Sequence, residues 1–311
     1  MNAIHSILVI VDPTAEHHPA VNKGALLAAK CGARLELYAC ETKASREARL
    51  AAHARSKPGE PFLLNLKAML EALAVPLREG GLDVATETEC RDPLHASLID
   101  RTQRTSADLV IKDTHHHSLA KRTFLTNTDW HLIRTCPVPL LLVKEKAWSA
   151  SPKVFAAVDP GHANDKPALL DKHILDHAST LARRLSGELH VVHAYIPMTV
   201  VATAASSPPM AMAISAEELA AEQKRQHEQV QALVAPYEVP ASRIHVELGG
   251  PAELLPRVTA AQQADILVMG AISRSGLKRV FVGSTAEDVL EHLPCDALIV
   301  KPPDFASMLP L

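Results

Sequence analysis

The sequence has few aromatic residues, no long apolar run and no paired-cysteine motif. Its aromatic residues are five Phe, three Tyr and two Trp. The core must therefore be built from Leu, Val, Ile and Ala, as in α/β domains with buried parallel strands. No apolar run reaches the roughly 18 residues of a membrane-spanning helix. The chain opens with a strand pattern instead of a basic and then apolar leader, so we expect a soluble, cytoplasmic protein that does not associate with membranes.

The charge argues against a nucleic-acid-binding protein, and the cysteine content argues against a protein held together by disulfides. The formal net charge is −3 and the isoelectric point is near 6.6. Because lysines and arginines are dispersed, the chain lacks the basic footprint of a nucleic-acid-binding protein. Five cysteines without CxxC spacing indicate reduced, mostly buried thiols, as is usual in the cytosol. They are Cys31, Cys40, Cys90, Cys136 and Cys295.

Apolar runs that end in turn residues recur in the same order in the two halves. The first half begins with SILVIVDP, ending at Asp12, and the second with KVFAAVDP, ending at Asp159. Such runs indicate buried parallel strands, and each is followed by a helical pattern. Helices are expected over about 19–31, 61–80, 166–185 and 216–235, and two more open at Pro93 and Pro251. The other strands expected are ARLELYAC, DVATETEC, DLVIKD and PLLLVK, then GELHVVHAY, RIHVELGG, DILVMG and DALIVK.

The spacing of equivalent residues shows that the chain is an internal repeat. Asp108 and Asp265 are 157 residues apart, and so are Lys144 and Lys301. Strand–helix alternation in both halves predicts the α/β class, with two doubly wound, open parallel sheets. We place the domains at 1–146 and 152–311. Two equivalent domains in one chain imply an internal pseudo-dimer.

The stretch GAISRSGLKRVFVGSTAEDVL, which begins at Gly270, is the leading candidate for a ligand site. In an open parallel sheet, ligands bind beyond the carboxyl ends of the strands, near the point where strand order reverses. Glycines let the backbone approach an anion, and a helix N-terminus adds free N–H groups. Ser284 and Thr285 could add hydroxyl donors, and Arg274 could supply positive charge. The alternative is a plain strand–helix connection, with Ser as a helix cap. The candidate binding residues of this half are Asp159, Gly250, Gly270, Ser273, Arg274, Gly283, Ser284 and Thr285.

These features together resemble the universal stress protein family in its tandem form. The resemblance rests on the VDP strand ends, on GGP before a helix, on Gly-x2-Ser-x9-Gly-Ser, and on TNTDWHLIRTCP in the first half. It implies ATP or another adenine nucleotide as ligand, with Mg²⁺ as an accompanying ion. The family pattern is Gly-x2-Gly-x9-Gly-Ser/Thr for phosphates and ribose, with an Asp at the end of the first strand near the adenosine. Ser273 departs from it, standing at the second glycine. The resemblance also implies pairing of the last strands, which end at Val143 and Val300.

The first half departs much further from the family pattern. Both glycines are lost, and an acidic side chain stands where phosphate would lie. Carboxylate and triphosphate repel each other, so this half is expected not to bind ATP in the family manner. The residues in place of Gly270, Ser273, Gly283 and Ser284 are Asp113, His116, Thr126 and Asn127.

No set of catalytic residues stands out. The chain has no GxSxG motif and no Walker lysine. Any ATP hydrolysis would be weak, since no general base or Mg²⁺-binding carboxylate is evident beyond Asp159. The run His115–His117 could contribute metal ligands, but solvated loop histidines are the alternative and the expectation is no metal.

The second half carries a long apolar insertion, IPMTVVATAASSPPMAMAISAEELAAE, that begins at Ile196. It follows the second strand, so it could cover the ligand edge as a Met-lined lid or pack on the partner domain. Three functions therefore compete. They are nucleotide binding in the second half, binding of an apolar or lipid-like ligand under the insertion, and a ligand-free interaction scaffold. A homodimer is compatible with all three.

Overall fold

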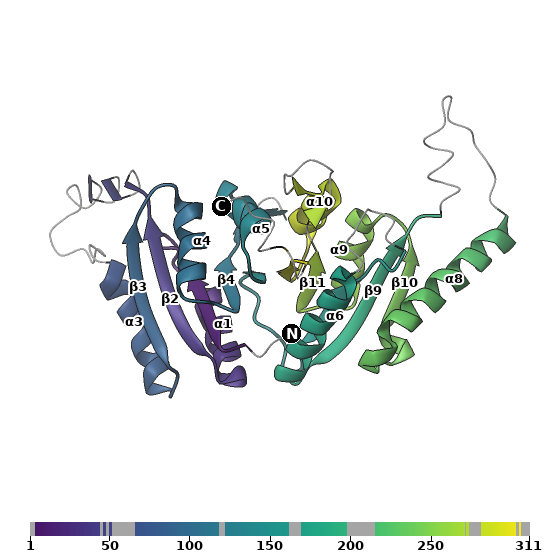
Figure 1. The fold of residues 1–311 in the computed structure, drawn as a ribbon, viewed down its shortest axis with the longest axis horizontal. Coiled ribbons are helices and arrows are strands. Elements are labelled where there is room, and N and C mark those ends of the chain that lie inside the picture. The colour runs from purple at the N-terminus through teal and green to yellow at the C-terminus, as the bar shows by residue number, and fades with distance from the viewer. Residues whose placement is uncertain are drawn as a thin grey trace, which may run out of the picture. The chain divides into compact units, whose positions relative to one another are not determined.

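The chain folds into two compact units, an N-terminal unit that comprises residues up to Ala147 together with Phe305, and a C-terminal unit from Trp148 to Asp304. Both are α/β (Figure 1). The computed structural model describes residues 4–43, 46–47, 50–51, 66–117, 122–161, 169–197, 215–270, 272–273, 281–302 and 305. For residues 115–117, 122–124, 272–273 and 281–282 it describes the backbone alone. Each unit is considered by itself.

The N-terminal unit is built on a parallel sheet with the strand order β7-β4-β1-β2-β3. Its strands are short, apolar and, at the centre, fully buried, which is why they read as continuous hydrophobic runs. Their bounds are β1 Ser6–Ile10, β2 Arg34–Glu41, β3 Val84–Cys90, β4 Leu109–Asp113 and β7 Leu140–Val143.

Helices cover both faces of this sheet. Helices α1 (Pro19–Cys31) and α3 (Leu66–Glu79) share one face, and α4 (Leu94–Arg104) and α5 (Asn127–Thr135) share the other. The first face requires a glycine, because a Cβ on Gly24 of α1 would lie 2.6 Å from the Val9 side chain. On the second face α4 reaches the sheet through ion pairs. The unit is therefore a doubly wound three-layer domain.

The C-terminal unit repeats this plan with the order β10-β9-β8-β11-β14. Helices α6 and α8 lie on one face of the sheet and α9 and α10 on the other. The strands are β8 Lys153–Ala157, β9 Glu188–Tyr195, β10 Ile244–Leu248, β11 Ile266–Gly270 and β14 Asp296–Val300, and the helices are α6 Leu170–Arg184, α8 Ala216–Val234, α9 Pro251–Ala261 and α10 Ser284–His292. Within the described ranges, no helix has the length and apolar character to cross a bilayer.

Matching contacts in the two units support the repeat. Asp108 accepts hydrogen bonds from the backbone at the start of β1, including Ser6 N at 3.0 Å. Asp265 does the same at the start of β8, where Lys153 N lies 2.9 Å from its carboxylate. In each unit, an aspartate directly before the fourth strand thus anchors the start of the first strand.

The sequence predicted most elements closely. Helix α1 has the predicted bounds, and α8 ends one residue before the predicted limit. The predicted starts of α3 and α6 fall partly outside the described residues. The prediction missed two antiparallel ribbons where it expected only loops. These are β5 (His115–His117) with β6 (Arg122–Phe124), and β12 (Ile272–Ser273) with β13 (Phe281–Val282).

We predict that Asp265→Ala lowers the free energy of unfolding of the C-terminal unit by about 2–4 kcal/mol. The carboxylate is buried and accepts from Ser149 N, Ser149 Oγ and Lys153 N, which would all lose their partner. The measurement is urea denaturation followed by Trp148 fluorescence, in a Trp130→Phe background. Trp148 reports on this unit because its indole N–H binds Asp296 at 2.7 Å.

The matched control is Asp288→Ala, which removes an exposed carboxylate of the same unit. Its effect should stay within about 0.5 kcal/mol. Equal effects of the two substitutions would contradict a structural role for Asp265.

Candidate functional site

The strand order of the C-terminal unit reverses between β8 and β11. From β8 the chain proceeds to β9 and β10 on one side, and then to β11 and β14 on the other. Val268 pairs with Ala156, so Gly270 lies beside the end of β8, next to Val158 and Asp159. Two predicted site residues, Asp159 and Gly270, therefore flank the place where ligands bind in open α/β sheets.

Asp159 is held by a second carboxylate that the sequence analysis did not single out. Its backbone N donates to Asp171 Oδ1 at 3.0 Å, and Asp171 lies buried in the first turn of α6. The Oδ2 atom of Asp159 is buried, and no described residue hydrogen-bonds to it. The backbone of Asp159 is thus held at the end of β8, while Oδ2 of its side chain remains available to a hydrogen-bond donor.

Gly270 has a packing reason to be glycine. A Cβ at this position would lie 2.7 Å from Cδ2 of Leu170, which is itself buried in the first turn of α6. Gly270 therefore permits close contact between β11 and α6, and its presence alone does not argue for a ligand.

The GGP segment forms the start of α9. Gly249 has a φ of +149°, a conformation that favours glycine, and its N–H donates to Tyr195 O at 2.9 Å. Gly250 is the N-cap of α9 and makes no side-chain cap. This joins the ends of β9 and β10 at the same edge of the sheet as Asp159.

The start of α10 offers the clearest opening for an anion. The ribbon places Ser273 opposite Phe281, two residues before Gly283, so the two ends of the loop come together. Gly283 is the N-cap with φ −69° and ψ 141°, which any residue can adopt, and α10 has no side-chain cap. No described residue accepts a hydrogen bond from the backbone N–H of Ser284 or Thr285. Arg274 lies outside the described residues.

In the N-terminal unit a carboxylate fills the position of Gly270. Asp113 is buried at the end of β4, and its Oδ1 accepts the backbone N–H of Ala20, in the first turn of α1, at 2.7 Å. Burial raises the pKa of Asp113 to about 6, although the hydrogen bond from Ala20 and the charges of Lys112 and Lys23 act against this rise. Asp113 therefore serves the helix start of its own unit, as a ligand carboxylate or phosphate could.

A second carboxylate occupies the start of α5. Asp129 Oδ2 accepts from Thr126 N at 2.7 Å and from Thr126 Oγ1 at 2.9 Å, which completes a capping box. Its other oxygen lies 2.8 Å from the ammonium of Lys112, in an ion pair whose carboxylate is fully buried. At α5 Thr126 Oγ1 accepts the N–H of Asp129 at 3.2 Å and the Asp129 carboxylate adds a negative charge beside the helix start, whereas α10 has no side-chain cap. Thr126 and Asn127, which replace Gly283 and Ser284, thus belong to an internal cap.

The histidines do not form a metal site within the described part of the chain, where no group of three His, Cys, Asp or Glu side chains could hold an ion. The side chains of His115–His117 lie outside the description, so that hypothesis is untested. His193 is hydrogen-bonded on both sides, to Val158 O at 2.9 Å and to Gln226 Oε1 at 3.0 Å. Packing and hydrogen bonding account for it.

The site residues that the sequence analysis missed are Asp171, Asp129 and Lys112. The Thr126-x-x-Asp129 spacing is a recognisable capping-box signal and could have been read from the sequence. The ion pair with Lys112 could not, since it joins residues of separate elements.

The universal stress protein family model matches residues 3–144 and 165–301. The chain belongs to the universal stress protein family. Among curated relatives, universal stress protein E of Salmonella typhi is 27% identical over the whole of this chain and 98% of its own length. The Escherichia coli K12 protein of the same name is 26% identical, with the same coverage. The tandem arrangement that the sequence predicted is confirmed.

Solved structures agree with this family assignment. A universal stress protein from Pseudomonas aeruginosa UCBPP-PA14 matches with a TM-score of 0.76 and 29% identity, covering 98% of this chain and 96% of its own. A universal stress protein from Archaeoglobus fulgidus matches with a TM-score of 0.65 at 14% identity, over 95% of this chain and 98% of its own. At that identity the second likeness shows the fold alone.

Asp113 makes the stability of the N-terminal unit depend on pH. The pKa of Asp113 in the folded unit is raised above its usual value of 3.8, so folding favours the protonated carboxyl. This contribution to stability is lost as the pH rises through about 6. Asp113→Asn keeps an acceptor for Ala20 N–H and does not ionise. We predict that the unfolding free energy of the wild type, relative to this variant, falls by about 2 kcal/mol between about pH 4.5 and 7.5. Urea denaturation of both proteins measures it.

Asp83→Asn is the control, because Asp83 is an exposed carboxylate of the same unit. Its unfolding free energy should follow that of the wild type at both pH values. A constant difference between wild type and Asp113→Asn across this range would show that Asp113 does not titrate as described.

Proposed function

We propose that the C-terminal unit binds an adenine nucleotide, such as ATP, and that the N-terminal unit does not. The phosphates lie against the start of α10, and the nucleoside lies toward Asp159. Gly250, Gly270 and Ser273 line the approach, Ser284 and Thr285 donate to phosphate oxygens, and Arg274 adds positive charge. The protein acts in the cytoplasmic stress response, as its family name implies.

The observation that carries this proposal is the contrast between α10 and α5. A helix N-terminus attracts anions through its free N–H groups and its dipole. At α5 a side-chain cap is already present: Thr126 Oγ1 accepts the N–H of Asp129, and the Asp129 carboxylate places a negative charge at the helix start, balanced by Lys112. At α10 the backbone would tolerate a capping side chain, yet Gly283 supplies none.

The orientation of the nucleotide follows from the charges at the edge. Two carboxylates, Asp159 and Asp171, stand at the end of β8 and the start of α6. They would repel phosphate but can accept hydrogen bonds from a ribose hydroxyl or an adenine amino group. If Mg²⁺ accompanies ATP, it binds mainly to the phosphates, as is usual for this ion. With Asp159 as the one evident carboxylate for hydrolysis, ATPase activity is weak at most.

Calorimetric titration with ATP and Mg²⁺ tests the proposal through Gly283→Asp. Aspartate is a good N-cap, so this variant closes the start of α10 without disturbing the fold. We expect saturable binding by the wild type and an affinity at least about tenfold lower in the variant, because the new carboxylate satisfies the N–H groups and repels phosphate. Pyrophosphate should lose affinity similarly, and adenosine much less.

Gly283→Ala is the matched control. Its backbone conformation suits alanine, and alanine does not cap a helix. It should bind ATP within a few-fold of the wild type. A wild type that does not bind ATP, or a Gly283→Asp variant that binds it as tightly, would overturn the proposal.

A second candidate ligand is apolar or lipid-like. Ile196 and Leu248, which follow or end neighbouring strands, are 45% and 50% exposed. Ile196 lies 4.0 Å from the position that a Cβ on Gly250 would take, so this apolar surface adjoins the candidate site. The Met-rich part of the insertion lies outside the described residues.

Native mass spectrometry of the purified protein separates the two ligands. An apolar ligand predicts a co-purified adduct that is weakened by Leu248→Glu, because the substitution places a charge in the apolar surface. ATP binding by calorimetry should be retained in that variant. The absence of any apolar adduct from the wild type would leave nucleotide as the better candidate.

A further inference from the structure

One layer of the C-terminal unit is lined by stacked rings instead of aliphatic side chains. On the face that α9 covers, β8, β9 and β10 contribute Phe155, His190 and His245. Phe155 stacks on His190 with ring centroids 4.6 Å apart and on His245 at 5.4 Å. Because β10 is the edge strand, these contacts help to hold the edge of the sheet.

The two histidines are hydrogen-bonded to each other. His190 Nδ1 lies 3.3 Å from His245 Nε2, and the rings are nearly parallel, 10° apart. The other ring nitrogen of His190 lies 3.3 Å from Glu188 Oε2, and Arg243 binds Oε1 of the same carboxylate at 2.6 Å. Arg243 fixes the carboxylate, and the carboxylate in turn orients His190.

These contacts limit how many protons the pair can hold. With Nε2–H of His190 donating to Glu188, Nδ1 of His190 accepts a hydrogen bond from His245 Nε2–H. A first extra proton can bind to Nδ1 of His245, which leaves the hydrogen bond between the rings in place. A second would turn N–H toward N–H and place two positive charges 3.3 Å apart.

The surrounding charges do not relieve this conflict. The groups that face the rings are Glu188 on β9, Glu247 on β10 and Arg243 just before β10. From α9, Arg257 binds Glu247 at 2.7 Å, and on β8 Lys153 acts on Glu188. Burial is the main cause that lowers the pKa of both histidines, and the charge of His245 lowers the pKa of His190 further. Each carboxylate is thus already shared with a cation.

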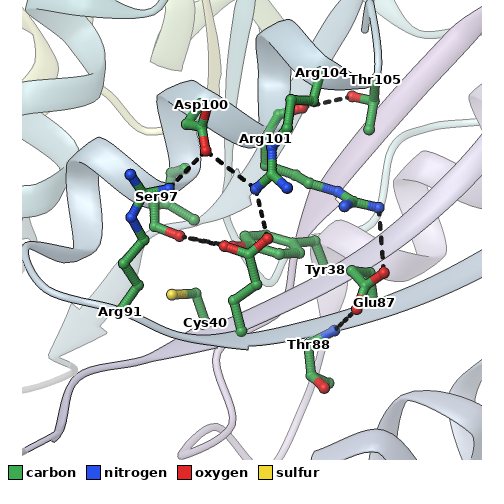
Figure 2. Close-up of polar contacts among 12 residues, drawn as sticks. Tyr38, Cys40, Glu87, Thr88, Arg91, Ser97, Asp100, Arg101, Arg104 and Thr105 are labelled. Atoms are coloured by element: carbon green, nitrogen blue, oxygen red, sulfur yellow. Dashed lines mark hydrogen bonds and ion pairs between the residues drawn. The ribbon is translucent and has the colours of Figure 1, made fainter.

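The N-terminal unit has different chemistry in the equivalent layer (Figure 2). There β2 and β3 face α4 with Glu36, Tyr38 and Glu87, and Arg101 pairs with Glu36 at 2.6 Å and Glu87 at 3.7 Å. None of these four residues is a histidine, the side chain that ordinarily changes charge in mild acid. The two units therefore differ in how this layer responds to mild acid.

We propose that the His190–His245 pair holds β10 to β9 only while it carries at most one proton, so that mild acid opens this edge of the C-terminal sheet. When β10 is detached from β9, water can hydrogen-bond to both imidazolium groups. The folded layer cannot accommodate both charges. Stability from the neutral pair is present above about pH 6.5, the usual pKa of histidine, and is lost as the pH falls below it.

Hydrogen exchange measured by mass spectrometry at about pH 7.5 and about pH 5, corrected for intrinsic rates, tests this. We expect protection of the amides of β10 to fall at least about tenfold at the lower pH, while β8 and β11 stay protected. In the N-terminal unit β3 serves as the internal reference, since it is the matching edge strand without histidines. Unchanged protection of β10, or a loss shared with β8 and β11, would overturn the proposal.

Two variants assign the effect to the pair. His245→Phe and His245→Gln both remove one titrating ring, and the first keeps an aromatic ring beside Phe155. Protection of β10 should then depend little on pH. His292→Gln, an exposed histidine of α10, is the control and should behave as the wild type. Full acid sensitivity in either His245 variant would contradict the inference, and the wild-type comparison remains decisive if a variant folds poorly.

Discussion

Free N–H groups at helix starts are the constraint around which both ends of the repeat are organised. Each unit directs helix N-termini to the carboxyl edge of its sheet, and each start needs an acceptor. The N-terminal unit supplies acceptors from its own chain, with Asp113 for α1 and Thr126, held by Asp129, for α5. The C-terminal unit uses Asp171 to hold Asp159 and leaves α10 without a side-chain cap. The same fold therefore presents one closed edge and one open edge.

The sequence was sufficient for the fold because its signals were local and repeated. Apolar runs ending in Asp12 and Asp159 marked buried strands, and the constant offset between the halves fixed their order. It was less informative about the loops. The ribbons β5–β6 and β12–β13 depend on pairing across a loop, which periodicity cannot detect. At the site, Gly270 was read as a place for phosphate, yet its contact with Leu170 gives it a packing role as well.

The sequence also did not predict the polar contacts between elements that are far apart in the chain. The ion pair between Lys112 and Asp129 and the contact between His190 and His245 each join elements that are distant in sequence. The spacing of these residues in the sequence does not predict the two contacts. They arise because equivalent positions in the two halves accepted different charged or titratable side chains once the sheet had placed them side by side.

The internal cap at α5 also separates the thermodynamics of the two units. A site filled by its own carboxylate is always occupied, since its acceptor is covalently part of the chain and cannot be diluted. A site that depends on a free ligand is stabilised in proportion to the logarithm of that ligand's concentration. On the function proposed above, the stability of the N-terminal unit does not depend on nucleotide concentration, whereas the C-terminal unit would gain resistance to unfolding and proteolysis as nucleotide accumulates. The proposed function would thus give one chain a half whose stability is independent of nucleotide and a half whose stability follows the nucleotide concentration.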